Sequence, residues 1–135
     1  LTDKYITLFE HEFVRNFIHI QDVSSVFEFM IDNYNKHKGE IFNVGLSDTN
    51  INKKELVERI QQQIPNTSIT YSDYFEDPDK RNYVVSNEKI EATGWKPQYS
   101  LDDGISELIQ AYKMIVPQES SRYRNAFPLS YGQSI

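Results

Sequence analysis

The stretch that decides the fold is DPDKRNYVVSNEKIEATGWKP, which runs from Asp77 to Pro97. It opens with charged, turn-forming residues and continues into a short apolar segment, 83–85, that favours extended structure. A helix is predicted next, with Ser86 as its N-cap and Gly94 as the left-handed residue that ends it. Arg81 is therefore presented on a short loop between two packed elements, an arrangement suited to binding an anion.

Composition excludes several classes of protein. The 135 residues suffice for one domain with a hydrophobic core, and the net charge of −6 argues against a nucleic-acid partner. No apolar run approaches the ~18 residues of a membrane span, and the sequence shows no signal peptide pattern. The absence of cysteine excludes disulfides and thiolate metal sites. We therefore expect a soluble, cytoplasmic protein with neither nucleic acid nor membrane as a partner.

The N-terminal half follows a strand–helix–strand pattern. β-Branched and aromatic residues predict strands at 5–9 and 14–20. Asp22 is then expected to cap a helix that ends at Gly39. Its apolar stripe comprises Val23, Val26, Phe27, Met30, Ile31 and Tyr34. A further strand at 40–44 would complete a parallel βαβ unit.

The C-terminal half continues the alternation of helices and strands. Asn52 and Glu55 have the spacing of a capping box at the start of a helix that Pro65 terminates. A strand is expected at 68–71, and Ser100 with Asp103 caps the last helix. The sequence predicts one compact α/β unit at 1–116, followed by an extended or disordered tail at 117–135.

Arg15 and Arg81 are the best candidates for a binding site. Each lies at the edge of a predicted extended segment, and two guanidinium groups can clamp a diphosphate through paired hydrogen bonds. The alternative is that each arginine pairs with a nearby carboxylate, which for Arg81 would be Asp77 or Asp79. Spacing alone leaves both interpretations open.

Other patterns favour structural roles. Tyr34 and Lys38 match the Tyr-x-x-x-Lys spacing of short-chain dehydrogenases, but Tyr34 completes a helical stripe and is expected to pack in the core. The three histidines lie in different elements, with no spacing suited to a metal. The five glycines are isolated, so no glycine-rich phosphate-binding loop is present.

Four segments, taken in order, resemble the C-terminal part of the extended short-chain dehydrogenases/reductases. This is the NAD-dependent epimerase/dehydratase family of nucleotide-sugar enzymes, typified by UDP-glucose 4-epimerase. The four segments are VRNFIHIQDV (14–23), GEIFNVG (39–45), DKRNYVVS (79–86) and GWKP with SLDDGI (94–97 and 100–105). Each is weak alone, but together they span nearly 100 residues in the family's order. The resemblance implies the C-terminal part of a Rossmann-like fold with its small substrate-binding subdomain.

The resemblance also implies a function. In such enzymes the arginine before the Phe-Ile-His strand and the late arginine contact the diphosphate of the substrate, which assigns Arg15 and Arg81 to one ligand. Tyr83 is assigned, on looser grounds, to the wall of the sugar or base pocket, and Asn16 departs from the family's usual aspartate. The cofactor loop and the catalytic Tyr/Lys pair would lie upstream of Leu1, where NAD(P) would bind. The full-length enzyme would form a homodimer, and this segment alone would be inactive.

The sequence leaves two function hypotheses. In the first, the chain, which starts without methionine, is the substrate-side segment of an NAD(P)-dependent epimerase, dehydratase or oxidoreductase. In the second, it is a stand-alone nucleotide-sugar binding or assembly module without catalytic activity. A segment taken from a Rossmann domain should leave a sheet edge exposed, whereas a module should bind a nucleotide sugar without NAD.

Overall fold

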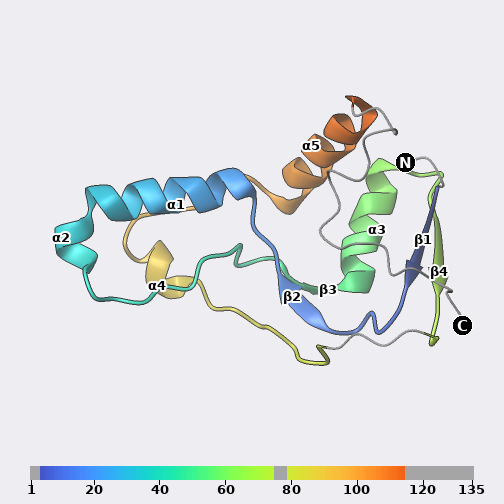
Figure 1. The fold of residues 1–135 in the computed structure, drawn as a ribbon, viewed down its shortest axis with the longest axis horizontal. Coiled ribbons are helices and arrows are strands. Elements are labelled where there is room, and N and C mark those ends of the chain that lie inside the picture. Colours follow the sequence, from blue (N-terminus) through green and yellow to red (C-terminus); the bar gives the residue numbers. More distant parts are fainter. Residues whose placement is uncertain (1–3, 75–78, 115–135) are drawn as a thin grey trace, which may run out of the picture.

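The fold is mixed α/β, as a computed structural model of the chain shows (Figure 1). The structure describes residues 4–74 and 79–114, so the tail predicted at 117–135 and Asp77 lie outside the described residues. The elements are β1 (Tyr5–Leu8), β2 (Val14–Asn16), α1 (Ile20–Asp32), α2 (Tyr34–His37), β3 (Asn50–Asn52), α3 (Lys53–Gln63), β4 (Ser68–Tyr71), α4 (Glu88–Glu91) and α5 (Leu101–Met114).

The described strands form two separate two-stranded sheets. β1 pairs in parallel with β4, with Tyr5 opposite Ser68, and β2 pairs antiparallel with β3, with Arg15 opposite Ile51. The prediction of strands at 14–20 and 40–44 joined as a parallel βαβ unit is therefore wrong. β2 ends at Asn16 because Thr49 and Leu46 take over the hydrogen bonding of the next residue. The Phe17 amide donates to Thr49 Oγ1 at 3.3 Å, and the Phe17 carbonyl accepts from the Leu46 amide at 3.2 Å.

α1 begins earlier than the sequence predicted. His19 is its N-cap, and the ring Nδ1 of this histidine accepts the Gln21 amide at 3.2 Å. The prediction of Asp22 as the N-cap is wrong, because its carboxylate instead accepts the amides of Gln98 and Tyr99 at 2.8 and 3.1 Å. The helix is interrupted at Asn33, which separates α1 from α2.

The caps in the second half follow the prediction more closely. Asn52 and Glu55 form the expected capping box, in which each side chain accepts the other residue's amide at 2.9 Å. Ser100 and Asp103 likewise bond reciprocally at the start of α5. Gly94 has the predicted positive φ, +98°. Asn87, rather than the predicted Ser86, precedes α4, and residues 83–85 form no strand.

One cluster of buried apolar residues lies beside α1. Val26, Ile90 and Trp95 form its buried centre, and the Trp95 indole Nε1 donates to Ser25 Oγ at 3.1 Å. The partly buried residues around it are Ile18, Phe29, Met30, Phe42 and Val44.

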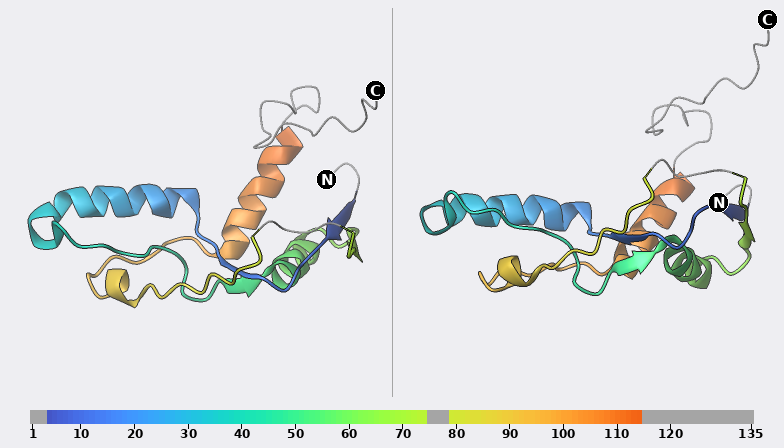
Figure 2. Two further views of the ribbon diagram at one scale, coloured as in Figure 1. Left: turned by 60° about the horizontal axis from the view of Figure 1, so that its bottom comes forward. Right: turned by 90° about the horizontal axis from the view of Figure 1, so that it is seen from below.

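The molecule is elongated rather than compact. Figure 2 shows α1, α2 and α4 at one end and α3 with the two sheets at the other. Much of the predicted apolar stripe of α1 is uncovered, since the exposed fractions of Phe27 and Ile31 are 67% and 74%. Tyr34 is 64% exposed, so the prediction that it packs in the core is wrong. Within the described residues, no helix combines the length and the apolar character needed to cross a membrane.

Candidate functional site

Arg15 is positioned by the pairing of β2 with two different segments. One edge of β2 bonds to β3. Residues 82–83 also bond to β2, where the Tyr83 amide donates to the Val14 carbonyl at 3.0 Å and the Asn82 side chain accepts the Val14 amide at 2.9 Å. The segment that starts at Asp79 therefore runs beside β2 and brings together residues that are 66 positions apart in the chain.

The guanidinium of Arg15 forms hydrogen bonds to the backbone of the segment that starts at Asp79. Its Nη1 donates to the Arg81 carbonyl at 2.5 Å, and its Nη2 donates to the Asp79 carbonyl at 3.0 Å. The Arg15 side chain is 24% exposed. Arg15 is thus a partly covered cation whose orientation is set by main-chain oxygens.

Asp79 lies at the centre of the predicted site residues. Its carboxylate accepts from Arg81 Nε at 2.7 Å and from the Tyr83 hydroxyl at 2.7 Å, and it lies 3.9 Å from Arg15 Nη2. The hydrogen bond from Arg81, followed by the one from Tyr83, lowers the pKa of Asp79 to about 2. The ion pair between Arg81 and Asp79 that the sequence left open as an alternative is therefore present.

The ring of Tyr83 lies close to both arginines. Its ring centroid is 4.9 Å from the Arg15 guanidinium carbon and 5.3 Å from that of Arg81, within the range of cation–π contacts. The hydrogen bond to Asp79 raises the pKa of Tyr83, because ionisation would remove the proton that the carboxylate accepts.

The structure thus brings Arg15, Arg81 and Tyr83 into one cluster, which with Asp79 we call the arginine cluster. Its two guanidinium groups and one carboxylate carry a formal charge of +1 on a chain with a net charge of −6. Arg81 is 74% exposed at its side chain, and its hydrogen bond to Asp79 uses Nε. Such a cluster can bind an anion with several oxygens.

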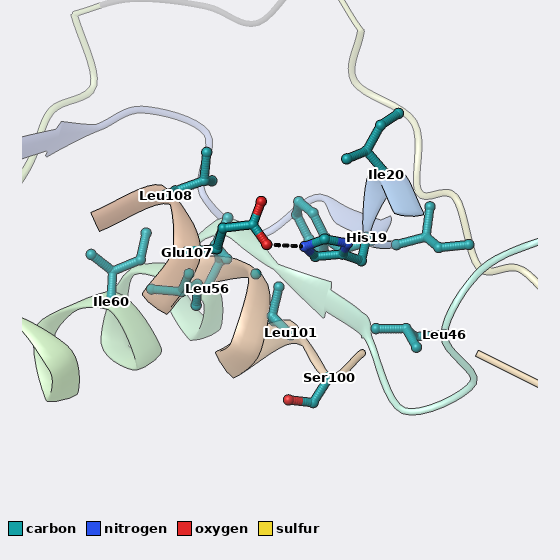
Figure 3. A pocket seen from close by; sticks show the side chains of 13 residues that line it. His19, Ile20, Leu46, Leu56, Ile60, Ser100, Leu101, Glu107 and Leu108 are labelled. Atoms are coloured by element: carbon teal, nitrogen blue, oxygen red, sulfur yellow. Dashed lines mark hydrogen bonds and ion pairs between the residues drawn. The ribbon is translucent and has the colours of Figure 1, made fainter. Parts of the chain in front are cut away.

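A second feature, an apolar cavity of about 420 Å³ between α3, α5 and residues 17–20, was not predicted. Figure 3 shows the ring of His19 directed at the carboxylate of Glu107, with Leu56 of α3 near Leu101 of α5. His19 Nε2 donates to Glu107 Oε2 at 3.0 Å, because Nδ1 is occupied as the acceptor of the helix cap. Periodicity predicted the apolar residues of α3 and α5, but nothing in the sequence indicated that these two helices face each other.

The remaining sequence candidates do not join either feature. Lys38 follows α2 and lies on the same exposed end of the molecule as Tyr34, far along the chain from the arginine cluster. His11 contacts Glu12 at 2.9 Å, and the ring of His37 lies against Phe42. The part of the chain that the structure describes contains no cluster of histidine and carboxylate side chains suited to a metal ion.

Comparison with known proteins relates the chain to sugar-nucleotide enzymes, although no protein-family model matches it. A dTDP-4-dehydro-6-deoxyglucose reductase from Escherichia coli is 31% identical over 103 residues, which cover 73% of this chain and 31% of the reductase. A putative GDP-L-fucose synthase from Arabidopsis thaliana is 27% identical over 106 residues, which cover 78% of this chain and 31% of the synthase.

Comparison of the fold with solved structures relates the chain to the same class of enzymes. The solved structure of a dTDP-glucose 4,6-dehydratase from Bacillus anthracis, in complex with NAD, superposes with a TM-score of 0.64 at 26% identity, covering 83% of this chain and 35% of the dehydratase. The chain spans about a third of the length of the curated relatives that it matches. Both comparisons confirm the resemblance that the four sequence segments indicated. The chain is therefore similar, over about a third of their length, to nucleotide-sugar dehydratases and reductases of the extended short-chain dehydrogenase/reductase family.

Proposed function

We propose that the chain is the substrate-binding part of an NAD(P)-dependent nucleotide-sugar epimerase, dehydratase or reductase. In this proposal Arg15 and Arg81 bind the diphosphate of the nucleotide sugar, and Tyr83 lines the adjoining pocket. One observation carries the proposal: these three residues, chosen from the sequence as ligand contacts, lie in one cluster.

The geometry supports different roles for the two arginines in ligand binding. Arg15 is held by two main-chain carbonyls at 2.5 and 3.0 Å, so its charge stays in place without a ligand. Arg81 is more exposed and can reorient toward an incoming phosphate. Guanidinium groups suit this task because their planar fork matches two phosphate oxygens at once.

The reaction itself would depend on residues outside this chain. The proposed enzyme would oxidise or reduce a ring carbon of the sugar by hydride transfer to or from NAD(P), the chemistry that this cofactor supplies. Because the sequence has no glycine-rich loop, the cofactor would be held mainly by a dinucleotide-binding part upstream of Leu1, together with the catalytic Tyr/Lys pair. By itself the segment would bind the ligand without turnover.

The exposed surfaces of the chain support a segment of a larger fold over a stand-alone module. β1 and β4 form a sheet of two strands, whereas a Rossmann sheet is larger. The apolar stripe of α1 at Phe27 and Ile31 is also uncovered, and large exposed apolar patches usually mark interaction surfaces.

Titration of the 135-residue chain with GDP and with dTDP, followed by calorimetry, tests the diphosphate assignment. Arg15→Ala and Arg81→Ala should each weaken binding by about tenfold to a hundredfold, because each removes charged hydrogen bonds worth about 1.5–3 kcal/mol. Arg59→Ala is the matched control, since it removes the same charge from an ion pair with Asp102 on α5, away from the cluster. Equal affinities for all four proteins would refute the diphosphate assignment.

A further inference from the structure

Within the arginine cluster, the carboxylate of Asp79 accepts the hydrogen bonds that a phosphate would accept from Arg81 and Tyr83. It takes one hydrogen bond from Arg81 Nε and one from the Tyr83 hydroxyl, both at 2.7 Å. Its second oxygen also lies 3.9 Å from Arg15 Nη2. Carboxylates and phosphates accept the same charge-assisted hydrogen bonds, so the two anions compete for the same donors.

The backbone of residues 79–83 is also held by hydrogen bonds that do not involve the Asp79 carboxylate. The backbone of residues 79–83 is fastened by Arg15, which binds the carbonyls of Asp79 and Arg81. The Tyr83 amide adds a bond to the Val14 carbonyl. These bonds use main-chain atoms or Arg15, and all of them would remain if the Asp79 side chain rotated away. The carboxylate itself bonds to the side chains of Arg81 and Tyr83, two and four positions further along the same segment, and lies 3.9 Å from Arg15 Nη2.

The strength of the ion pair between Asp79 and Arg81 determines how easily a ligand displaces the carboxylate. Arg81 is 74% exposed and Asp79 is 34% exposed, and exposed ion pairs shift an equilibrium by only about two- to fivefold. A diphosphate brings more negative charge than one carboxylate, and it can engage Arg15 and Arg81 together. A competitor of this strength would lower the affinity for the ligand without blocking the site.

We propose that Asp79 is an affinity-determining residue that competes with the diphosphate for Arg81 and Tyr83 and leaves them when the ligand binds. This inference rests on the proposed function, since it names the group that the ligand must displace at the same site. In the unliganded protein the carboxylate keeps Arg81 and Tyr83 oriented. Upon binding, the side chain turns toward solvent while residues 79–83 stay beside β2.

The test compares the wild-type chain with Asp79→Asn and Asp102→Asn, using inorganic pyrophosphate and GDP as probes. Asp79→Asn removes the competing charge, so both probes should bind about two- to fivefold more tightly. Asp102→Asn removes the same charge from the exposed ion pair between Arg59 of α3 and Asp102 of α5. This variant should leave the affinity for both probes unchanged. In the wild-type protein, the NMR signal of the Arg81 Nε–H group should shift as pyrophosphate replaces the carboxylate.

The outcomes separate this inference from the proposed function. If the wild-type chain binds GDP but Asp79→Asn binds it equally or more weakly, Asp79 is a supporting residue and the competition is refuted. If pyrophosphate binds more tightly to Asp79→Asn while GDP binds to none of the three proteins, the competition is supported and the nucleotide assignment fails. If neither probe binds to any of the three folded proteins, both proposals are overturned.

Discussion

The buried carboxylate of Asp22 gives the sharpest stability prediction. Asp22 is 1% exposed in the first turn of α1 and accepts the amides of Gln98 and Tyr99 at 2.8 and 3.1 Å. Asp22→Ala leaves the amides of Gln98 and Tyr99 without this acceptor in two partly buried hydrogen bonds. Each hydrogen bond to a charged group contributes about 1.5–3 kcal/mol, so the expected loss in the free energy of unfolding is about 3–6 kcal/mol. Whole domains are stable by only about 5–15 kcal/mol, so this variant should be close to unfolding.

Urea unfolding followed by the fluorescence of Trp95, the only tryptophan, measures this loss. Asp22→Asn keeps one acceptor oxygen and should lose about half as much as Asp22→Ala. Asp32→Asn is the matched control because Asp32 is exposed near the end of the same helix, and its effect should stay within about 0.5 kcal/mol. A loss below about 1 kcal/mol for Asp22→Ala would refute the reasoning that this carboxylate fastens residues 98–99 to α1.

Three further predictions follow from single contacts. A Cβ at Gly45 would lie 1.8 Å from Asn16 Oδ1, so Gly45→Ala should destabilise the chain by about 1–3 kcal/mol in urea unfolding, and by less when Asn16 is also alanine. Asn52→Ala removes half of the capping box and should cost about 1 kcal/mol, measured in the same way. The Asp79 carboxyl should titrate by NMR near pH 2, and Arg81→Ala should move the midpoint up toward about 4, because the hydrogen bond from Arg81 lowers this pKa. The ion pair between Arg81 and Asp79 therefore stabilises the fold above about pH 4, and this contribution is lost as the pH falls through about 2. An unchanged midpoint in Arg81→Ala would contradict the conclusion that Arg81 lowers the pKa of Asp79.

The sequence predicted correctly those features that are determined by residues close to one another in the chain. β4 has the predicted bounds, and the Asn52–Glu55 capping box and the left-handed Gly94 are as expected. Each depends on residues within a few positions of one another, so a short window contains the information. Arg15, Arg81 and Tyr83 were chosen partly on a resemblance, because no local pattern shows that residues 66 positions apart are neighbours.

The errors occur where a distant segment decides the local structure. Residues 17–19 have the composition of a strand, but Thr49 and Leu46 satisfy Phe17 and end the ladder at Asn16. Asp22 has the composition of an N-cap, but the amides at 98–99 compete for it, and His19 caps the helix instead. In both cases the hydrogen-bond partner lies 29 or more positions away, beyond any local pattern.

α1 shows why a periodic pattern cannot say which surface is covered. Its apolar positions predicted a helix correctly, but only Val26 on that stripe is buried, against Trp95, while Phe27 and Ile31 are 67% and 74% exposed. An apolar stripe on a helix normally faces a core. The described residues cover this stripe at Val26 and leave it exposed at Phe27 and Ile31. Periodicity therefore identifies the helix and its apolar positions, whereas the distant segments that pack against the helix decide which of these positions are buried.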